Sequence, residues 1–185
     1  MGIYKQIKNS IANLLLKREL KLLNCTRVAN KFNFGEVKTI GILFDASNVE
    51  EFELVKRYII YLREYNKRVK AIGFYTARKV PPTMYSKLEF DFISRKELSF
   101  TGKPTGVVVK NFIEEEYDLL IDLNIYNHFP LKYIAALSKA KFKVGKYEQE
   151  HTEIYDMMIN IKDSKTIKYL LSQIDTYVMM LNKAS

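Results

Sequence analysis

Short apolar runs alternate with longer amphipathic segments along most of this 185-residue chain. The runs at 37–45 (VKTIGILFD), 69–75 (VKAIGFY) and 117–123 (YDLLIDL) are rich in β-branched residues and almost continuously apolar. Such runs are typical of strands that are buried on both faces of a parallel sheet. A segment with helical periodicity separates the first two runs, and this strand–helix–strand order predicts a right-handed parallel crossover unit. The pattern therefore restricts the chain to an α/β fold.

The same patterns predict the bounds of the elements. Strands are expected at 37–45, 69–75, 90–93, 117–123, 142–145 and 154–161. Helices are expected at 2–24, 47–66, 107–116, 130–139 and 166–181. We predict a single doubly wound, Rossmann-like parallel sheet of five or six strands in residues 37–185, preceded by a basic amphipathic helix and linker in residues 1–36.

The expected N-terminal helix carries an apolar stripe. Its members at helical spacing are Ile3, Ile7, Ile11, Leu14, Leu15 and Leu22, with lysines on the other sides. An apolar stripe of this kind is most often buried on protein, so packing on the chain's own domain or on a partner is our first interpretation. A membrane surface and RNA are the alternatives.

Positive charge is concentrated at the N-terminal end. Of a formal net charge of +9, residues 1–40 carry +6 and residues 41–185 carry +3. A basic end on a nearly neutral body favours an anionic partner such as RNA, DNA or a phospholipid surface. Lysines outnumber arginines by 23 to 7, however, and an AT-rich genome would give this bias without any anionic partner.

Basic pairs also follow the second and third expected strands, where phosphate groups could be bound. The candidate polyanion-binding residues are Lys5, Lys8, Lys17, Arg18, Lys21, Arg27, Lys31, Arg78, Lys79, Arg95 and Lys96. Lys141 and Lys143 alternate with apolar residues and are expected on one strand face. There they would contact RNA or protect an exposed sheet edge from aggregation.

A second group of polar residues follows the first and fourth expected strands. The candidate small-ligand residues are Asp45, Ser47, Asn48, Asp122, Asn124 and His128. They are nominated because ligands of open parallel sheets bind beyond the carboxyl ends of the strands. His128 could act there as a general base. The alternative is that Asp45, Ser47 and Asn48 cap the following helix, and that His128 caps the helix at Pro130.

Several familiar motifs are absent. The sequence contains no GxGxxG, no GxxxxGK[ST] and no GxSxG, which removes the main support for dinucleotide binding, P-loop nucleotide binding and serine hydrolysis. A single cysteine, Cys25, excludes an internal disulfide framework. His151, Glu153 and Asp156 have only loosely ligand-like spacing. We assign no catalytic residue, expect no cofactor and no metal, and lean towards a protein that is not an enzyme.

The runs at 40–48 (IGILFDASN), 88–92 (LEFDF) and 117–145 (YDLLIDLN to FKVG) together resemble a family of small bacterial proteins of unknown function, over nearly the whole chain. Residues 117–145 are also similar to the acceptor-side half of heptosyltransferase-type glycosyltransferases, in which a DLxIDL strand precedes a helix. That resemblance implies a lone α/β half, acting as a binding module or as a subunit that depends on a partner.

Three functions remain open. The leading hypothesis is a non-catalytic polyanion-binding protein that associates with RNA or the ribosome. The second is an enzyme or a binding domain for a sugar phosphate or nucleotide, and the third is a peripheral membrane or complex-assembly adaptor. No run reaches the roughly 18–20 apolar residues of a transmembrane segment, and the N-terminus lacks a secretory signal, so a cytoplasmic location is expected.

Overall fold

The computed structural model describes residues 2–22, 32–81 and 90–181, which form an α/β fold on one sheet. The main elements are α1 (Gly2–Leu22), β1 (Thr39–Asp45), α2 (Val49–Glu64), β2 (Arg68–Tyr75), β3 (Phe90–Ser94), α3 (Val107–Glu114), β4 (Leu119–Asp122), α4 (Phe129–Leu137), β5 (Phe142–Lys146), β6 (Met157–Ile159) and α5 (Ile167–Met180). Short 3-10 helices lie at Phe34–Glu36, Arg95–Glu97 and Gln149–His151.

The sheet has six strands in the order β3-β2-β1-β4-β5-β6, and every neighbouring pair is parallel. The prediction of a doubly wound parallel sheet is therefore confirmed. The chain first builds outwards from β1 to β3 and then returns to add β4 on the other side of β1. This reversal creates a switch point between the carboxyl ends of β1 and β4, where ligands of such folds are bound.

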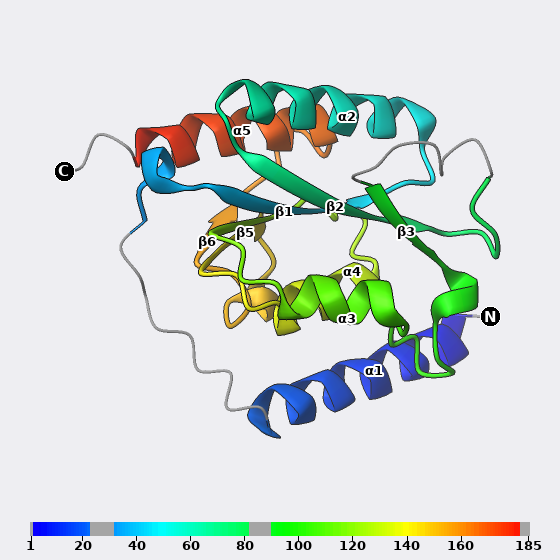
Figure 1. Ribbon diagram of the computed structural model, residues 1–185. Coiled ribbons are helices and arrows are strands. Elements are labelled where there is room, and N and C mark those ends of the chain that lie inside the picture. Colours follow the sequence, from blue (N-terminus) through cyan, green and yellow to red (C-terminus); the bar gives the residue numbers. More distant parts are fainter. Residues whose placement is uncertain (1, 23–31, 82–89, 182–185) are drawn as a thin grey trace.

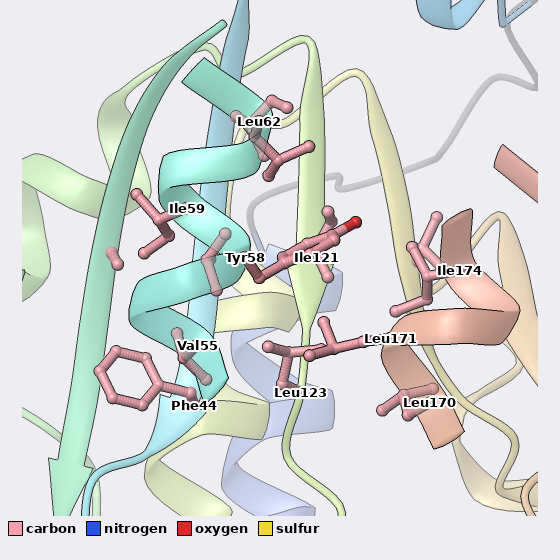
Figure 2. Close-up of a cluster of buried hydrophobic side chains, with 14 of the residues drawn as sticks. Phe44, Val55, Tyr58, Ile59, Leu62, Ile121, Leu123, Leu170, Leu171 and Ile174 are labelled. Atoms are coloured by element: carbon pink, nitrogen blue, oxygen red, sulfur yellow. The ribbon is translucent and has the colours of Figure 1, made fainter. Parts of the chain in front are cut away.

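Helices cover both faces of the sheet. Figure 1 shows α2 and α5 on one face and α3 and α4 on the other, with α1 as the outermost helix beyond them. The core under α2 and α5 joins Phe44 of β1 to Val55 and Leu62 of α2, and Leu170 and Ile174 of α5 extend it (Figure 2). The continuous apolar character of β1 follows from this position, because both of its faces are buried.

Local features explain where two elements lie. Asn48 begins α2, since its Oδ1 accepts hydrogen bonds from the backbone N–H groups of Glu50 (2.9 Å) and Glu51 (3.2 Å). Gly73 lets β2 pass close to the aromatic core, because a Cβ there would lie 2.7 Å from Phe44 Cζ. In the described part of the chain, no helix is long and apolar enough to cross a membrane.

The C-terminal half differs from the prediction in two places. The strand expected at 154–161 is only the three-residue β6, and the chain before it forms a 3-10 turn at Gln149–His151. Lys143 does not lie on an exposed face with Lys141, because β5 is an interior strand and Lys143 is buried. Its Nζ donates to the carbonyl oxygens of Ala135 (2.8 Å) and Ala136 (3.1 Å), which lie at the end of α4.

The N-terminal helix packs on its own domain, but through residues other than the predicted stripe. Ala12 and Leu16 are buried, whereas Leu14 and Leu22 are 69% and 73% exposed. Polar contacts fix this orientation. Lys132 of α4 donates to Asn13 Oδ1 (3.0 Å), and Glu19 accepts from the Tyr133 hydroxyl and from Lys103, both at 2.8 Å. The members of the predicted stripe whose side chains the structure describes, Ile11, Leu14, Leu15 and Leu22, are therefore exposed rather than buried on the domain.

Candidate functional site

The switch point brings two of the candidate ligand residues into direct contact. Asp45 ends β1 and His128 precedes α4, and His128 Nε2 lies 2.8 Å from Asp45 Oδ2. Burial alone would raise the pKa of Asp45, but hydrogen bonds from His128 and Ser47 outweigh it and hold that pKa below its usual value. An ionised carboxylate only accepts, so Nε2 carries the proton in this hydrogen bond.

Asn124 fixes the loop that carries His128. Its Oδ1 accepts from the backbone N–H of His128 (2.8 Å), and its Nδ2 donates to the backbone oxygen of the same residue (2.9 Å). Asn127, inside this loop, has a φ of 57°, in the left-handed region that few residues other than glycine adopt. Such a conformation is kept only where surrounding contacts determine it, so the position of His128 is imposed by the fold.

A buried carboxyl group lies beside this pair. Asp122 ends β4, and its side chain accepts from the Asn124 backbone N–H and from the Tyr155 hydroxyl. Burial raises the pKa of Asp122 to about 6, although these hydrogen bonds act in the opposite direction. Tyr155 was not among the predicted site residues, because it falls in a segment that we expected to be a strand.

Ser47 and Asn48 lie at the same edge but have structural contacts. Asn48 caps α2 as expected, whereas Ser47 exchanges hydrogen bonds with Thr76, Oγ to Oγ1 at 2.9 Å, after β2. The alternative interpretation of His128 as a side-chain cap of α4 is wrong. Asp45 accepts only from the Ser47 backbone at this helix start, and His128 occupies the cap position of α4 without a side-chain cap.

The switch-point residues thus form a network of donors and acceptors around one His–Asp pair. His128 is 23% exposed through its side chain, and its ring lies 5.3 Å from Phe74 and 6.0 Å from Tyr126. Tyr126 donates to Glu51 Oε1 at the start of α2. Among the described residues, no group of three or more His, Cys, Asp or Glu side chains is placed to hold a metal ion. The arrangement suits hydrogen bonding to a polar ligand.

A second candidate site is basic and lies at the carboxyl ends of β2 and β3. The Arg95 N–H donates to the Ala77 backbone oxygen (3.2 Å), and the Ser94 Oγ lies 3.0 Å from the Arg78 backbone oxygen. These contacts join the two loops, so that the exposed residues Arg78, Lys79, Arg95 and Lys96 form one cluster, which we call the loop cluster. None of the four forms an ion pair within the described ranges.

The other predicted polyanion-binding residues are distributed differently. Lys5, Lys8, Lys17, Arg18 and Lys21 lie on α1, where the last three are exposed. Arg27 and Lys31 lie outside the described residues. Lys103, in the loop between β3 and α3, forms an ion pair with Glu19 of α1, which compensates its positive charge.

A hollow of about 250 Å³ lies at the opposite edge of the sheet, near the amino ends of the strands. Its lining includes Phe32, Glu36 and the ion pair between Lys141 and Asp118, whose Nζ and Oδ1 are 2.7 Å apart. Asp118 also accepts from the backbone N–H groups of residues 38 and 39, and this carboxylate therefore ties the start of β1 to β4. The rule that ligands of parallel sheets bind beyond the carboxyl ends of the strands does not predict a site at this edge.

The fold and the switch point define a Rossmann-like α/β protein. A family model described as "Family of unknown function (DUF6913)" matches residues 8–181, and the chain belongs to this family. The expected membership of a family of unknown function is thereby confirmed. A search of curated proteins and a search of solved structures gave no significant match. Neither search supports the resemblance of residues 117–145 to glycosyltransferases.

Proposed function

We propose that the protein is a non-catalytic RNA-binding protein that holds phosphate groups at the loop cluster, with structured RNA such as that of the ribosome as its ligand. The observation that supports this proposal is the joining of two basic loops into one group of four exposed cations. The arginine and lysine side chains of this cluster form no ion pair within the described ranges and are available to contact phosphate oxygens. Glu97, the nearest carboxylate in sequence, is held by hydrogen bonds from Ser94, Oγ to Oε2 at 2.6 Å.

The salt dependence of RNA affinity tests this proposal. We expect a fluorescently labelled structured RNA, such as a hairpin, to bind the full chain with an affinity that falls steeply as salt is raised, because bound phosphates release counterions. In the fourfold variant Arg78→Gln, Lys79→Gln, Arg95→Gln, Lys96→Gln, the slope of log affinity against log salt should flatten by about 3 and the affinity should fall about tenfold or more. Fluorescence anisotropy measures both quantities.

The matched control replaces four exposed lysines elsewhere: Lys110→Gln, Lys162→Gln, Lys165→Gln, Lys168→Gln. It removes the same net charge and should keep most of the affinity and the slope. Absence of binding at low salt, or an equal loss in the two variants, would overturn the proposal.

The Asp45–His128 pair supports a second candidate function, the binding of a small polar ligand at the switch point. We expect a nucleotide or sugar phosphate from a panel to raise the melting temperature of the wild-type protein. At about one hundred times its Kd, a ligand stabilises the fold by about 2.7 kcal/mol. In Asp45→Asn the rise should disappear, whereas Glu50→Gln, an exposed carboxylate on α2, should respond as the wild type does. A panel without any effect, or an unaltered response in Asp45→Asn, rejects this candidate.

A further inference from the structure

The outer face of α1 combines exposed apolar side chains with exposed cations. Ile11 and Leu15 are 48% and 42% exposed, and Leu14 and Leu22 are exposed more fully. Lys17, Arg18 and Lys21 are exposed on the same helix. Several large apolar side chains exposed on one helix are typical of a surface where something else binds.

This face is held outwards by the rest of the fold. Ala12 and Leu16 are buried against the domain, and Asn13 and Glu19 are bonded to Lys132, Tyr133 and Lys103. Figure 1 shows α1 as the outermost helix of its layer, with no other element beyond it. The exposed leucines therefore cannot turn inwards without breaking these contacts.

The charge of the helix decides between possible occupants. Residues 2–22 contain five basic residues and a single acidic one, Glu19, which faces the domain and accepts from Lys103 and Tyr133. If a second copy of the chain packed through the same face, the basic residues of the two copies would lie close together with no carboxylate between them. RNA would neutralise the cations, but leucine and isoleucine side chains neither stack on bases nor hydrogen bond to them.

An anionic lipid surface satisfies both features. Helices that lie in the membrane interface place apolar side chains at the boundary with the acyl chains and basic side chains among the headgroups. Anionic headgroups attract each lysine or arginine near the surface. We propose that the outer face of α1 seats the protein on a bilayer that contains anionic phospholipid. This inference is independent of RNA binding at the loop cluster, because it uses other residues.

Sedimentation with vesicles tests the proposal on the full chain. We expect binding to sucrose-loaded vesicles of phosphatidylcholine with phosphatidylglycerol and little binding to phosphatidylcholine alone. The variant Leu14→Gln, Leu15→Gln should lower the partition coefficient about tenfold or more. The variant Arg18→Gln, Lys21→Gln should lower it to a similar extent on anionic vesicles.

The matched control is Val49→Gln, Ile60→Gln, which changes two exposed apolar residues on α2, on the other side of the sheet. It should bind vesicles as the wild type does, and so should the fourfold loop-cluster variant. Because all of these positions are exposed, circular dichroism should report the same fold in each variant.

Three results would overturn the proposal. The first is that wild-type protein ignores anionic vesicles, or that Leu14→Gln, Leu15→Gln binds them as the wild type does. The second is that light scattering finds a dimer that this variant dissociates, which would make a second copy the occupant. The third is that the variant loses RNA affinity but retains vesicle binding, which would assign the face to RNA.

Discussion

The Asp122→Asn variant is expected to gain about 3 kcal/mol of stability relative to the wild type when the pH is raised from 3 to 7. The pKa of Asp122 is about 6 in the folded protein, against an ordinary value of 3.8, and this difference is worth about 3 kcal/mol. Asparagine cannot ionise; its oxygen can accept from the Asn124 backbone N–H, and its NH2 group can donate to the Tyr155 hydroxyl oxygen. Urea unfolding of the two proteins at both pH values measures the effect.

The direction of this pH effect follows from the state, folded or unfolded, in which Asp122 binds its proton more tightly. Between pH 4 and 6 the folded state keeps the Asp122 proton while the unfolded state has released it, so this group makes the fold less stable as the pH rises. Near pH 3 the carboxyl group is largely protonated in both states, and the two proteins should differ little. Near pH 7 the wild type bears a buried charge that the variant lacks.

Other carboxylates act in the opposite direction, which is why the comparison between two proteins is needed. Hydrogen bonds hold the pKa values of Asp45 and Asp118 below their usual values, so the stability that these groups provide is lost as the pH falls. They are the same in both proteins and cancel in the difference. The control Asp91→Asn, exposed on β3, should follow the wild type at both pH values. Parallel stability curves for Asp122→Asn and wild type would contradict the prediction.

The Phe44→Ala variant is expected to lose about 4 kcal/mol of unfolding free energy. Phe44 is fully buried in β1, and its ring centroid lies 5.6 Å from that of Phe52, 6.1 Å from Phe90 and 6.4 Å from Phe92. These rings come from three elements, so truncation leaves a cavity that no single neighbour can fill. Urea unfolding at pH 7 gives the change.

Phe100→Ala provides the matched control for this loss, because Phe100 is 83% exposed. Its effect should stay within about 0.5 kcal/mol, as is usual for surface positions. A loss below about 1 kcal/mol in Phe44→Ala would show that the aromatic cluster can collapse around the gap.

The strands and their parallel arrangement were accessible from sequence because burial on both faces leaves a direct mark. β1 and β4 are almost continuously apolar up to the aspartate that ends each of them, and Asn48 marks the start of α2 by its capping chemistry. The rule that ligands bind at carboxyl ends also placed Asp45 and His128 at one edge, although not in contact. The 2.8 Å approach between these two residues depends on the strand order, which no local pattern contains.

Other features depend on tertiary contacts that one sequence does not reveal. α1 has apolar residues on most of its circumference, so periodicity could not decide that Ala12 and Leu16, rather than Leu14, would be buried. Tyr155 lies 33 residues after Asp122 in the sequence, yet its hydroxyl donates a hydrogen bond to the Asp122 carboxyl group. Lys143 was expected at the surface because lysine usually is, but the free carbonyl groups at the end of α4 allow its ammonium group to be buried.

The position of β1 in the centre of the sheet has a consequence for biosynthesis. β2 and β3 can add to one side of β1 soon after they emerge, but its other side pairs with β4, which is made only when residues 119–122 have been translated. Until then the most apolar strand of the nascent chain has an unpaired edge, which is a template for association between chains. Pairing with β4, which lies in the second half of the chain, therefore removes the unpaired edge of β1.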